Sequence, residues 1–378
     1  MKNIVYLVFA LLLAVAGPVC GQSQYTLGNI PEGWTVTADE QSVTVTNGTA
    51  TITEGATVVL TPPNPAFVKS VTLTDAPAPA PSCRRVDLSQ ITADSVIQDC
   101  DTLTGTLAAN VKISIANGAT VILDGVSINA DGNWTSGNYA GITCEGDATI
   151  ILKDDTTNTV KGFNENYSGI YVPESSTLTI QGETSGTGKL IASSNGYGAG
   201  IGGGSNISCG NINIQGGDIK ATGGKWAAGI GSGFNASCDT ITISGGTVNA
   251  TGGKSAAGIG SGYNASCDTI TISGGNVTAT GGKYAAGIGS GEGSSCGNIT
   301  ITSGVTSVTA TKGTDALNSI GAGPNGSCGT VTFDTQQMYN GSNWTTTPTS
   351  GQTYGGLNFT IKTTTSNNDT WELTPPSN

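Results

Sequence analysis

Histidine is absent from the 378 residues of this sequence. Its absence excludes the Ser–His and Cys–His pairs of nucleophilic catalysis and every metal site built on imidazole. Charged residues are also few, at 11% of the chain, against about a quarter in ordinary domains. They are mostly acidic, with a formal net charge of −12 at pH 7. Because nucleic acids and anionic membrane surfaces are bound through clusters of cations, we expect neither as a partner.

Long apolar runs are missing too, apart from one near the N-terminus. That run, Ile4–Ala16, follows Lys2 and is shorter than the roughly 20 apolar residues of a transmembrane helix. Small residues around Cys20 fit cleavage before Gln22, so we interpret residues 1–21 as a signal peptide. The sequence therefore predicts a secreted, extracellular or cell-surface protein without a membrane span. A lipoprotein acylated at Cys20 is the alternative, although the residues before Cys20 fit that signal poorly.

What the chain has instead is a strict internal repeat. The triplet Ala-Gly-Ile recurs every 29 residues between positions 199 and 288, and we call its isoleucine the anchor of each repeat. A cysteine and a Thr-Gly-Gly sequence recur at the same step. No window has a helical period, and the 58 glycines would weaken any helix. A fixed period of this length is typical of a stacked solenoid.

Residues 228–256 illustrate one repeat. They contain three short extended runs, 228–231, 240–244 and 247–251, separated by turns rich in Gly, Asn, Ser and Asp. Apolar and polar residues alternate in the second and third runs, so that each strand buries one face and exposes the other. Three strands and three turns per repeat predict an all-β chain that forms a right-handed parallel β-helix, with about 29 residues per coil.

The repeat continues with looser spacing on both sides, and we predict a solenoid over residues 83–333. Seven anchors mark its coils: Ile142, Ile170, Ile201, Ile230, Ile259, Ile288 and Ile320. Before it, residues 22–75 are a series of strand-like runs and predict a small β-sandwich-like module. The Pro/Ala-rich residues 76–82 would join the two as a stiff linker. Residues 334–378 are expected to form a C-terminal cap or tail, because an open solenoid end exposes unpaired strand edges.

Eight cysteines remain after the expected cleavage. Cys83 and Cys100 lie outside the ladder of cysteines, and we hypothesise that they form a disulfide, as suits an exported protein. The other six belong to the coils: Cys144, Cys209, Cys238, Cys267, Cys296 and Cys328. We expect a column of small buried thiols, but stacked coils also bring Cα atoms within disulfide range, so the disulfide pattern stays open. The ladder lacks CxxC pairs and does not predict a metal site.

Acidic residues of the early coils are the candidates for catalysis or cation binding: Asp124, Asp131, Asp147, Asp154, Asp155 and Glu165. Paired carboxylates hydrolyse glycosidic bonds, and carboxylate oxygens bind calcium. None of these acids forms a recognisable motif, and acids in turns also keep a protein soluble. We therefore predict no enzyme activity and no cofactor, with calcium as the alternative.

Aromatic residues make up only 6% of the chain, yet several recur at the period of the repeat. One column stands four residues before the anchors, with a serine as its gap: Tyr197, Trp226, Ser255 and Tyr284. Lysines stand beside it: Lys225, Lys254 and Lys283. A shorter pair follows its anchors by four residues: Phe234 and Tyr263. Rings spaced along a rod would stack on successive sugar rings, with polar neighbours supplying contacts. Alternatively, rings of adjacent coils stack on each other and shield the turn.

Two polar ladders complete the repeat. Asparagines recur five residues after the anchors and predict turn-stabilising amides: Asn206, Asn235, Asn264 and Asn325. Threonines form outward rows: Thr240 and Thr269, and Thr242, Thr271 and Thr300. Such rows order water in ice-binding solenoids, but exposed threonine is also a favoured strand residue, and we expect the second role.

The repeated AAGIGSG…SCDTITISGG, with residues 140–152 and 169–174, resembles secreted β-helix repeat proteins of anaerobic gut bacteria that are labelled carbohydrate-binding-domain proteins. The resemblance covers roughly residues 86–333 and is specific for architecture rather than activity. Residues 30–36 also look like a small β module attached to such proteins. The broader fold is similar to that of pectate lyases and polygalacturonases. Their Asp clusters, which work with calcium or with His and basic residues, have no counterpart here, so no catalytic residue is carried over.

The sequence thus predicts a secreted or surface-exposed β-helix protein that binds polysaccharide without cleaving it. The stacking column would be Tyr197, Trp226 and Tyr284. The lysines beside it, Lys225, Lys254 and Lys283, would favour acidic sugars. We expect a monomer. Two alternatives remain: a structural or adhesive rod that displays the N-terminal module, and a polysaccharide lyase or glycoside hydrolase of the pectin-degrading type.

Overall fold

The computed structural model divides into two compact units, residues 1–83 and 84–378. From Cys83 onward, the structure describes residues 83–132, 136–364 and 368–376. In the first unit it describes residues 24–27, 30, 32–38, 41–47, 49–53, 58–61, 63 and 71–73. The predicted signal peptide with Cys20 and the predicted linker 76–82 lie outside the described residues. Within the described residues, no helix has the length and apolar character to cross a membrane.

The first unit contains two antiparallel sheets. In one, β1 (Gln24–Leu27) pairs with β4 (Ala50–Thr53). The other has the order β3-β2-β5-β6 and consists of β2 (Thr35–Ala38), β3 (Gln41–Val43), β5 (Val58–Thr61) and β6 (Val71–Leu73). Ile30, Val36, Ala50 and Leu60 are buried together as its small core. The described part of this unit is all-β, as predicted.

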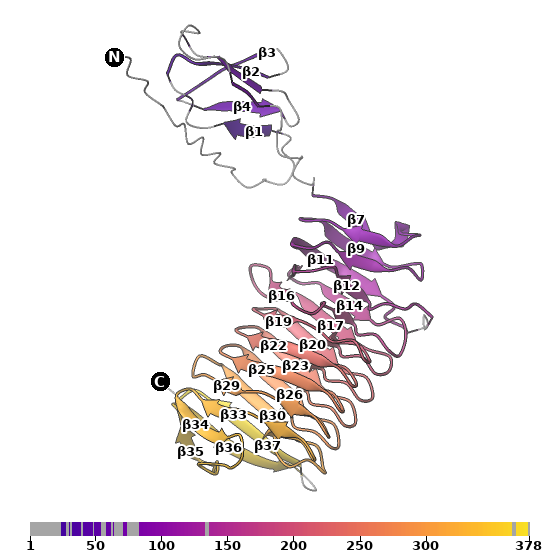
Figure 1. Ribbon diagram of the computed structural model, residues 1–378, viewed down its shortest axis with the longest axis vertical. Coiled ribbons are helices and arrows are strands. Elements are labelled where there is room, and N and C mark those ends of the chain that lie inside the picture. The colour runs from indigo at the N-terminus through magenta and orange to yellow at the C-terminus, as the bar shows by residue number, and fades with distance from the viewer. Residues whose placement is uncertain are drawn as a thin grey trace, which may run out of the picture. The chain divides into compact units, whose positions relative to one another are not determined.

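The second unit is a parallel β-solenoid (Figure 1). Its coils contribute strands to a nine-stranded anchor sheet and to one further continuous sheet, whose two faces we describe as a second and a third sheet. The long strand β11 (Ala119–Ile128) pairs with strands of both. The anchor sheet consists of β8 (Ser95–Ile97), β10 (Ile113–Ile115), β12 (Ile142–Cys144), β15 (Ile170–Tyr171), β18 (Ile201–Gly202), β21 (Ile230–Gly231), β24 (Ile259–Gly260), β27 (Ile288–Gly289) and β31 (Ile320–Gly321). The second sheet consists of β9 (Thr102–Thr106), β11 (Ala119–Ile128), β13 (Ala148–Leu152), β16 (Thr177–Gly182), β19 (Asn211–Ile214), β22 (Ser237–Ile243), β25 (Ser266–Ile272), β28 (Ser295–Cys296), β29 (Ile299–Ile301), β32 (Ser327–Cys328) and β33 (Thr330–Phe333). The third sheet consists of β14 (Thr157–Lys161), β17 (Lys189–Ser193), β20 (Asp218–Thr222), β23 (Thr247–Thr251), β26 (Asn276–Thr280) and β30 (Ser307–Thr311).

The anchors stack in register along the whole anchor sheet. Ile142 pairs with Ile170, and the same ladder continues through every anchor to Ile320. The cysteines of the second sheet stack in the same way from Cys209 to Cys328. Equal spacing in the sequence therefore becomes a straight column in space, and the predicted parallel β-helix is confirmed.

The interior of each coil is filled by the alternating apolar residues. In β22, Cys238, Ile241 and Ile243 are buried, while the residues between them are half-buried. In β23, Val248 and Ala250 are buried and their neighbours are exposed. Burial of an Ile or Val side chain stabilises the fold by about 1.5–3 kcal/mol. A single coil has no core of its own, so this stabilisation exists only when coils stack.

In the later coils glycine is required directly after the anchor. Five successive coils carry it: Gly202, Gly231, Gly260, Gly289 and Gly321. Their φ angles lie between 127° and 132°, in a region that residues with a side chain rarely adopt. At Gly260, an added Cβ would also lie 2.0 Å from the carbonyl oxygen of Gly289 in the next coil.

The first coil is held by a buried carboxylate. Asp101 is fully buried and accepts hydrogen bonds from the backbone N–H groups of Arg84 and Gln98, at 3.1 and 2.9 Å. The Arg84 guanidinium also donates two hydrogen bonds to the Asp101 carboxylate and forms an ion pair with it. Burial opposes ionisation, but these hydrogen bonds outweigh it and lower the pKa of Asp101. Next to these residues, β7 (Arg85–Asp87) pairs with β9, the short 3₁₀ turn η1 (Leu88–Gln90) follows, and Cys83 and Cys100 are both disulfide-bonded.

The last coil is covered by antiparallel strands. β34 (Gln336–Asn340) folds back on β33, and β35 (Gln352–Tyr354) pairs with β36 (Leu357–Thr364). β37 (Asn368–Thr374) pairs antiparallel with both β36 and β30. Trp371 packs against Trp344 and Phe359, with ring centroids 5.4 and 5.2 Å apart. These strands close edges of the second and third sheets, so the described part of the C-terminal stretch acts as a cap.

Candidate functional site

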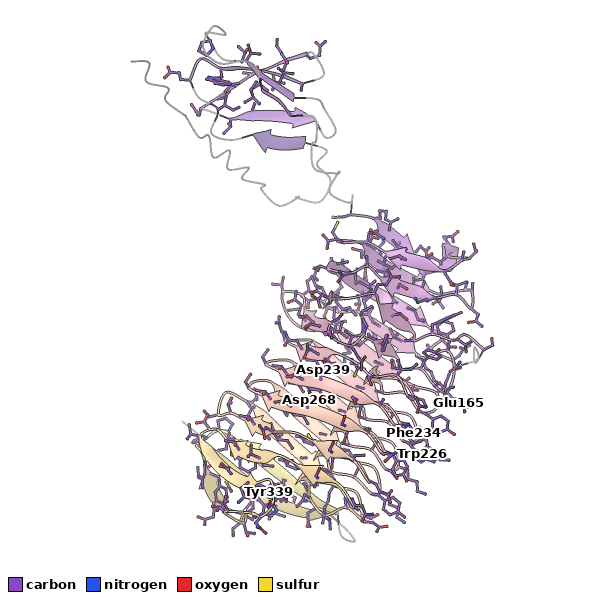
Figure 2. The ribbon with its side chains drawn as sticks, in the orientation of Figure 1. Glu165, Trp226, Phe234, Asp239, Asp268 and Tyr339 are labelled. Atoms are coloured by element: carbon purple, nitrogen blue, oxygen red, sulfur yellow. The ribbon has the colours of Figure 1, made fainter. Side chains whose placement is uncertain are left out.

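The aromatic residues of the repeat lie in the two turns that flank each anchor strand. Because β21 has only two residues, Trp226 before it and Phe234 after it reach the same edge of the solenoid (Figure 2). Backbone hydrogen bonds join these turns between coils. The Phe234 N–H donates to the Tyr197 carbonyl at 3.0 Å, and the Tyr263 N–H donates to the Trp226 carbonyl at 2.8 Å. The residue four positions before one anchor is therefore hydrogen-bonded to the residue four positions after the next anchor.

Four rings form one continuous cluster on this edge, which we call the aromatic ridge: Tyr197, Trp226, Phe234 and Tyr263. Tyr197 stacks on Trp226 with ring centroids 5.1 Å apart, and Phe234 stacks on Tyr263 at 5.9 Å. Trp226 also contacts Phe234 at 5.1 Å and Tyr263 at 5.8 Å. All four side chains are half-buried. Coils roughly 4.8 Å apart bring successive rings to the separations that aromatic pairs prefer.

The ridge differs from the predicted column of separate rings. The two aromatic columns form one cluster, because the anchor strands between them are so short. The rings cover part of each other's faces, as the alternative interpretation has it, and their edges and outer faces remain for a ligand. Tyr284 stands apart, since it has no ring contact with any residue in the described part of the chain.

Ser255 separates the ridge from Tyr284. Its side chain is buried, and its hydroxyl donates to the Glu292 carboxylate at 2.9 Å. Glu292 follows its anchor by four residues, as Phe234 and Tyr263 do, and its N–H donates to the Ser255 carbonyl at 3.0 Å. The gap in the aromatic column is therefore closed by a polar pair rather than left as an open slot.

The three predicted lysines are exposed and lie over aromatic rings. The Nζ of Lys225 is 5.1 Å from the centroid of the Trp226 ring. Two further ammonium groups lie over Tyr284, that of Lys254 at 5.8 Å and that of Lys283 at 4.9 Å. Such contacts are attractive because the ring face is electronegative.

Only one of these lysines has an acidic partner. Lys283 forms an ion pair with Asp315 at 3.1 Å, and the Tyr284 hydroxyl and Asp315 raise its pKa. Lys225 and Lys254 form no ion pair with a described residue. The edge thus carries two cations that are free to meet an anionic group.

Two hollows lie on the coils that precede the ridge. The first, which we call the tyrosine pocket, has a volume of about 180 Å³ and is walled by Tyr139, Tyr167 and Tyr171. The second, the polar hollow, has a volume of about 450 Å³ and is lined by four residues: Asn164, Glu165, Asn166 and Asn195. The Glu165 carbonyl accepts the N–H of Tyr197. Figure 2 shows Glu165 on the same edge as Trp226 and Phe234, whereas Asp239 and Asp268 lie across the solenoid from them.

The two hollows are absent from the sequence-based prediction. They lie on coils whose anchors are spaced by 28 and 31 residues, so their aromatic residues fall outside the strict repeat. The sequence nonetheless contains one pattern that points to the hollows. Asn138 lines the tyrosine pocket and Asn166 lines the polar hollow, and both stand four residues before an anchor, as Tyr197 and Trp226 do. Extending the same column toward the N-terminus would have found them.

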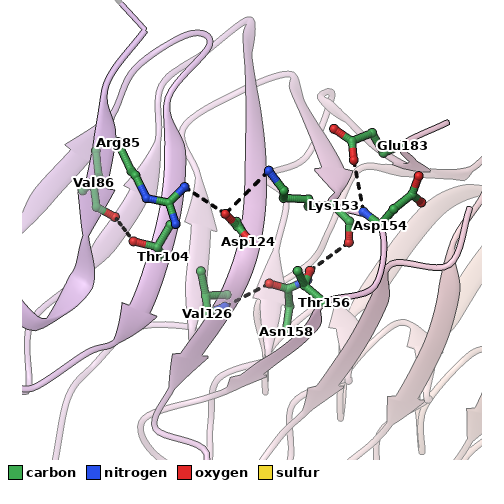
Figure 3. A network of polar contacts seen from close by, with 10 residues as sticks. All are labelled: Arg85, Val86, Thr104, Asp124, Val126, Lys153, Asp154, Thr156, Asn158 and Glu183. Carbon is green, nitrogen blue, oxygen red and sulfur yellow. Dashed lines mark hydrogen bonds and ion pairs between the residues drawn. The ribbon is translucent and has the colours of Figure 1, made fainter. Parts of the chain in front are cut away.

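The acids proposed for catalysis or calcium mostly hold turns and neighbouring coils together. Asp124 accepts from Arg85 at 2.9 Å and lies 3.8 Å from the Lys153 ammonium (Figure 3). Asp154 accepts the Ser185 N–H at 2.7 Å. The remaining candidates lie as follows: Asp147 accepts the Thr177 N–H, Asp155 accepts the Thr187 hydroxyl, Asp131 is exposed, and Glu165 lines the polar hollow. Among the described residues, no three His, Cys, Asp or Glu side chains come together as a metal-binding group.

The six cysteines of the coils are buried free thiols. Burial raises the pKa of Cys144 to about 12. The pKa of Cys238 is raised by the hydrogen bond with Cys209 and by burial. Because all six side chains are buried, we expect reagents not to reach them while the coils stay closed.

The polar ladder of asparagines stabilises the turns. Asn235 donates to the Asn206 side chain at 2.6 Å and accepts from Asn264 at 3.0 Å. All four predicted residues, Asn325 included, have positive φ angles, between 51° and 55°. Asparagine tolerates this left-handed conformation, which explains its recurrence five residues after the anchors.

Comparison with known proteins bears on the scaffold rather than on the ligand. A family model described as a beta helix repeat matches residues 212–234, 241–263 and 270–292. Each match begins in the second sheet and ends four residues after the next anchor, at Phe234, Tyr263 and Glu292. No curated protein and no solved structure matches the chain. The repeat match and the stacked coils agree that this chain is a parallel β-helix protein.

Proposed function

We propose that the chain is an exported protein that binds polysaccharide along the aromatic edge of its solenoid and does not cleave it. The aromatic ridge carries this proposal. It is an uninterrupted strip of four half-buried rings along one edge of the solenoid. Aromatic side chains supply the apolar surface on which the C–H faces of sugar rings pack. The resemblance to proteins labelled as carbohydrate-binding supports the same class of ligand.

The stacking of the rings on each other defines how a ligand would lie. A sugar ring does not fit between Tyr197 and Trp226, whose centroids are 5.1 Å apart. A glycan chain would instead lie across the ring edges and outer faces, parallel to the stack of coils. Lys225 would reach it beside Trp226, and Lys254 would reach it beside Tyr284. These two unpaired cations favour a polysaccharide that contains acidic residues.

Affinity gel electrophoresis of the full chain with a series of neutral and acidic polysaccharides tests the proposal. We expect retardation by at least one polymer, with affinity about three- to tenfold lower after Trp226→Ala, which removes one ring contact. The double variant Trp226→Ala/Tyr284→Ala should bind more weakly still, and Trp226→Phe should retain most of the affinity. Unchanged retardation in the double variant would contradict the proposed surface.

The charge of the ligand is tested by the lysines. Lys225→Ala/Lys254→Ala should weaken binding of acidic polymers at low salt, and the difference should shrink as salt screens the charges. Lys220→Ala is the matched control, because Lys220 is an exposed lysine on the third sheet. Incubation with pectins and glycosaminoglycans should release neither unsaturated products nor new reducing ends. Release of either would favour a lyase or hydrolase, and a chain that binds no polysaccharide would favour the structural rod.

A further inference from the structure

The tyrosine pocket has fixed aromatic walls. The Tyr139 ring packs edge-on against the fully buried Phe163, with centroids 4.7 Å apart. The Tyr139 hydroxyl donates to the Asn110 side chain at 2.7 Å, which fixes the other end of the ring. Tyr171 lies on β15 in register with Thr143 of β12, so these two pocket residues are neighbours in the anchor sheet. Walls held in this way are already arranged for a ligand.

The pocket is open because the next coil lacks a side chain beside Tyr171. Ile170 pairs with Ile201, so the residue that follows Tyr171 along the column is Gly202. The pocket is bounded on that side by Gly204 and Ile207. Tyrosine therefore occupies a position that is glycine in each of the next five coils, and no ring is stacked on its other side.

A hydroxyl without a partner lies among the residues that line the pocket. Ser168 is 1% exposed, and its Oγ has no hydrogen-bond partner among the described residues. Buried hydroxyls are nearly always satisfied by protein, water or ligand. The unsatisfied group is unfavourable for the empty protein, and a polar ligand atom that reached it would be stabilised.

The charge around the pocket is balanced. Lys112 is the only cation among its lining residues. Its backbone N–H donates to the Asp94 carboxylate at 2.8 Å, which places an acid beside it. Burial and the charge of Asp94 raise the pKa of Tyr139, so the ring keeps its proton at neutral pH. The pocket thus differs from the ridge, where two lysines lack an acidic partner.

We propose that the tyrosine pocket binds a single neutral pyranose residue, at the end or on a branch of the polysaccharide that the ridge holds. The sugar would place its C–H face on the tyrosine rings and its hydroxyls against Ser168, Thr143 and Asn138. At about 180 Å³ the pocket is smaller than the roughly 300–1,000 Å³ of sites for drug-sized ligands, and it fits one ring rather than a chain. The choice of a sugar rests on the proposed function.

The pocket and the ridge lie on consecutive coils of the same edge. Asn206, next to Ile207 of the pocket, donates its N–H to the Phe234 carbonyl at 2.8 Å. Ser205 donates its N–H to the carbonyl of Asn166, which lines the polar hollow, at 2.7 Å. A glycan on the ridge therefore reaches the pocket by passing over the polar hollow. The pocket would recognise one residue of that glycan and set its position along the coils.

Monosaccharide probes separate the two surfaces, because one ring is too small to span the ridge. The full chain is titrated with the methyl glycosides of glucose, galactose and mannose, and with glucuronic and galacturonic acids, by saturation-transfer NMR and calorimetry. We expect at least one methyl glycoside to bind, with little dependence on salt, and the uronic acids to bind more weakly. Tyr171→Ala should lower this affinity at least tenfold, whereas Tyr171→Phe and Trp226→Ala should leave it within about twofold.

Ser168→Ala distinguishes a ligand contact from a structural role. Loss of one hydrogen bond should weaken glycoside binding about three- to tenfold. The midpoint of thermal unfolding should stay the same or rise, because the variant removes an unsatisfied buried hydroxyl. A lower midpoint would show that the hydroxyl has a partner in the protein and would overturn its assignment to the ligand.

The outcomes for the pocket and the ridge are independent. If no methyl glycoside binds while polysaccharide retardation remains sensitive to Trp226, the pocket proposal is wrong and the proposed function stands. Binding of the uronic acids alone, or glycoside binding that Tyr171→Ala leaves unchanged, would also overturn the pocket. Glycoside binding that depends on Tyr171, in a chain that no polysaccharide retards, would instead support the pocket and reject the ridge. Circular dichroism of each variant confirms that the coils are intact.

Discussion

The glycine column of the anchor sheet allows backbone strain and contact between coils to be measured separately. Gly260 and Gly321 both follow an anchor and have nearly the same φ, 130° and 127°. Their surroundings differ. A Cβ added at Gly260 would lie 2.0 Å from the Gly289 carbonyl oxygen. The nearest heavy atom to a Cβ added at Gly321 would be 3.6 Å away, in the Asn318 side chain. Alanine at either position would therefore have the same backbone strain, but only alanine at Gly260 would clash with the next coil.

The expected magnitudes follow from these contacts. A residue with a side chain in such a conformation costs about 1–3 kcal/mol, and replacing glycine restricts the unfolded chain, which returns about 0.4–1 kcal/mol. Gly321→Ala should therefore lower the free energy of unfolding by about 1–2 kcal/mol. Gly260→Ala adds the displacement of a carbonyl in a packed stack, and should cost about 1–3 kcal/mol more.

Urea denaturation followed by far-ultraviolet circular dichroism measures both variants against the parent chain. The unfolded-state contribution is the same for both and cancels in the comparison. Equal losses would show that the approach of the next coil does not enforce glycine, and a larger loss for Gly321→Ala would contradict the stacking geometry. If neither variant lost stability, the left-handed conformation itself would be in doubt.

Two further predictions concern the thiols and the first coil. Ellman's reagent should find no reactive thiol among the cysteines of the coils in the native chain and six after denaturation without reductant, because all six side chains are buried; fewer than six would indicate disulfides within the ladder. Asp101 has a lowered pKa, so its contribution to stability is present above the unfolded-state value of about 3.9 and is lost as the pH falls through the lower folded-state value. The difference in unfolding free energy between the parent and Asp101→Asn should accordingly be constant from neutral pH to about pH 5 and shrink below about pH 4, and a difference that stays constant to pH 2 would contradict the assigned ion pair.

The architecture could be predicted from the sequence because one residue type recurs where every coil needs it. Ile201, Ile230 and Ile259 must each fill the same interior position, so their spacing reports the length of a coil directly. The glycines that follow the anchors from Ile201 to Ile288 have a comparable constraint from the carbonyl of the next coil. Where a physical requirement is repeated in this way, periodicity alone identifies the fold.

The arrangement of the candidate site depends on features that periodicity does not report. Trp226 and Phe234 are eight residues apart, and their contact follows from an anchor strand of only two residues and from the hydrogen bonds between turns. The burial of Ser255 depends on Glu292, a residue of the following coil. The tyrosine pocket requires one coil in which tyrosine replaces the glycine of later coils, on a stretch where the spacing is irregular. Each of these depends on which side chains face each other across coils.

The position four residues before the anchor changes its residue type along the solenoid, and this change bears on its role. A purely structural position repeats one residue type, as the anchor repeats isoleucine and the following position repeats glycine in the later coils. The column instead runs from asparagine in the early coils through Tyr197 and Trp226 to Ser255 and Tyr284. Stacking between coils alone would be satisfied by the same ring in each coil. A linear ligand whose successive residues differ in shape and charge would require such a sequence of contacts. The changing chemistry along an otherwise uniform scaffold therefore favours a binding edge over a shielded turn.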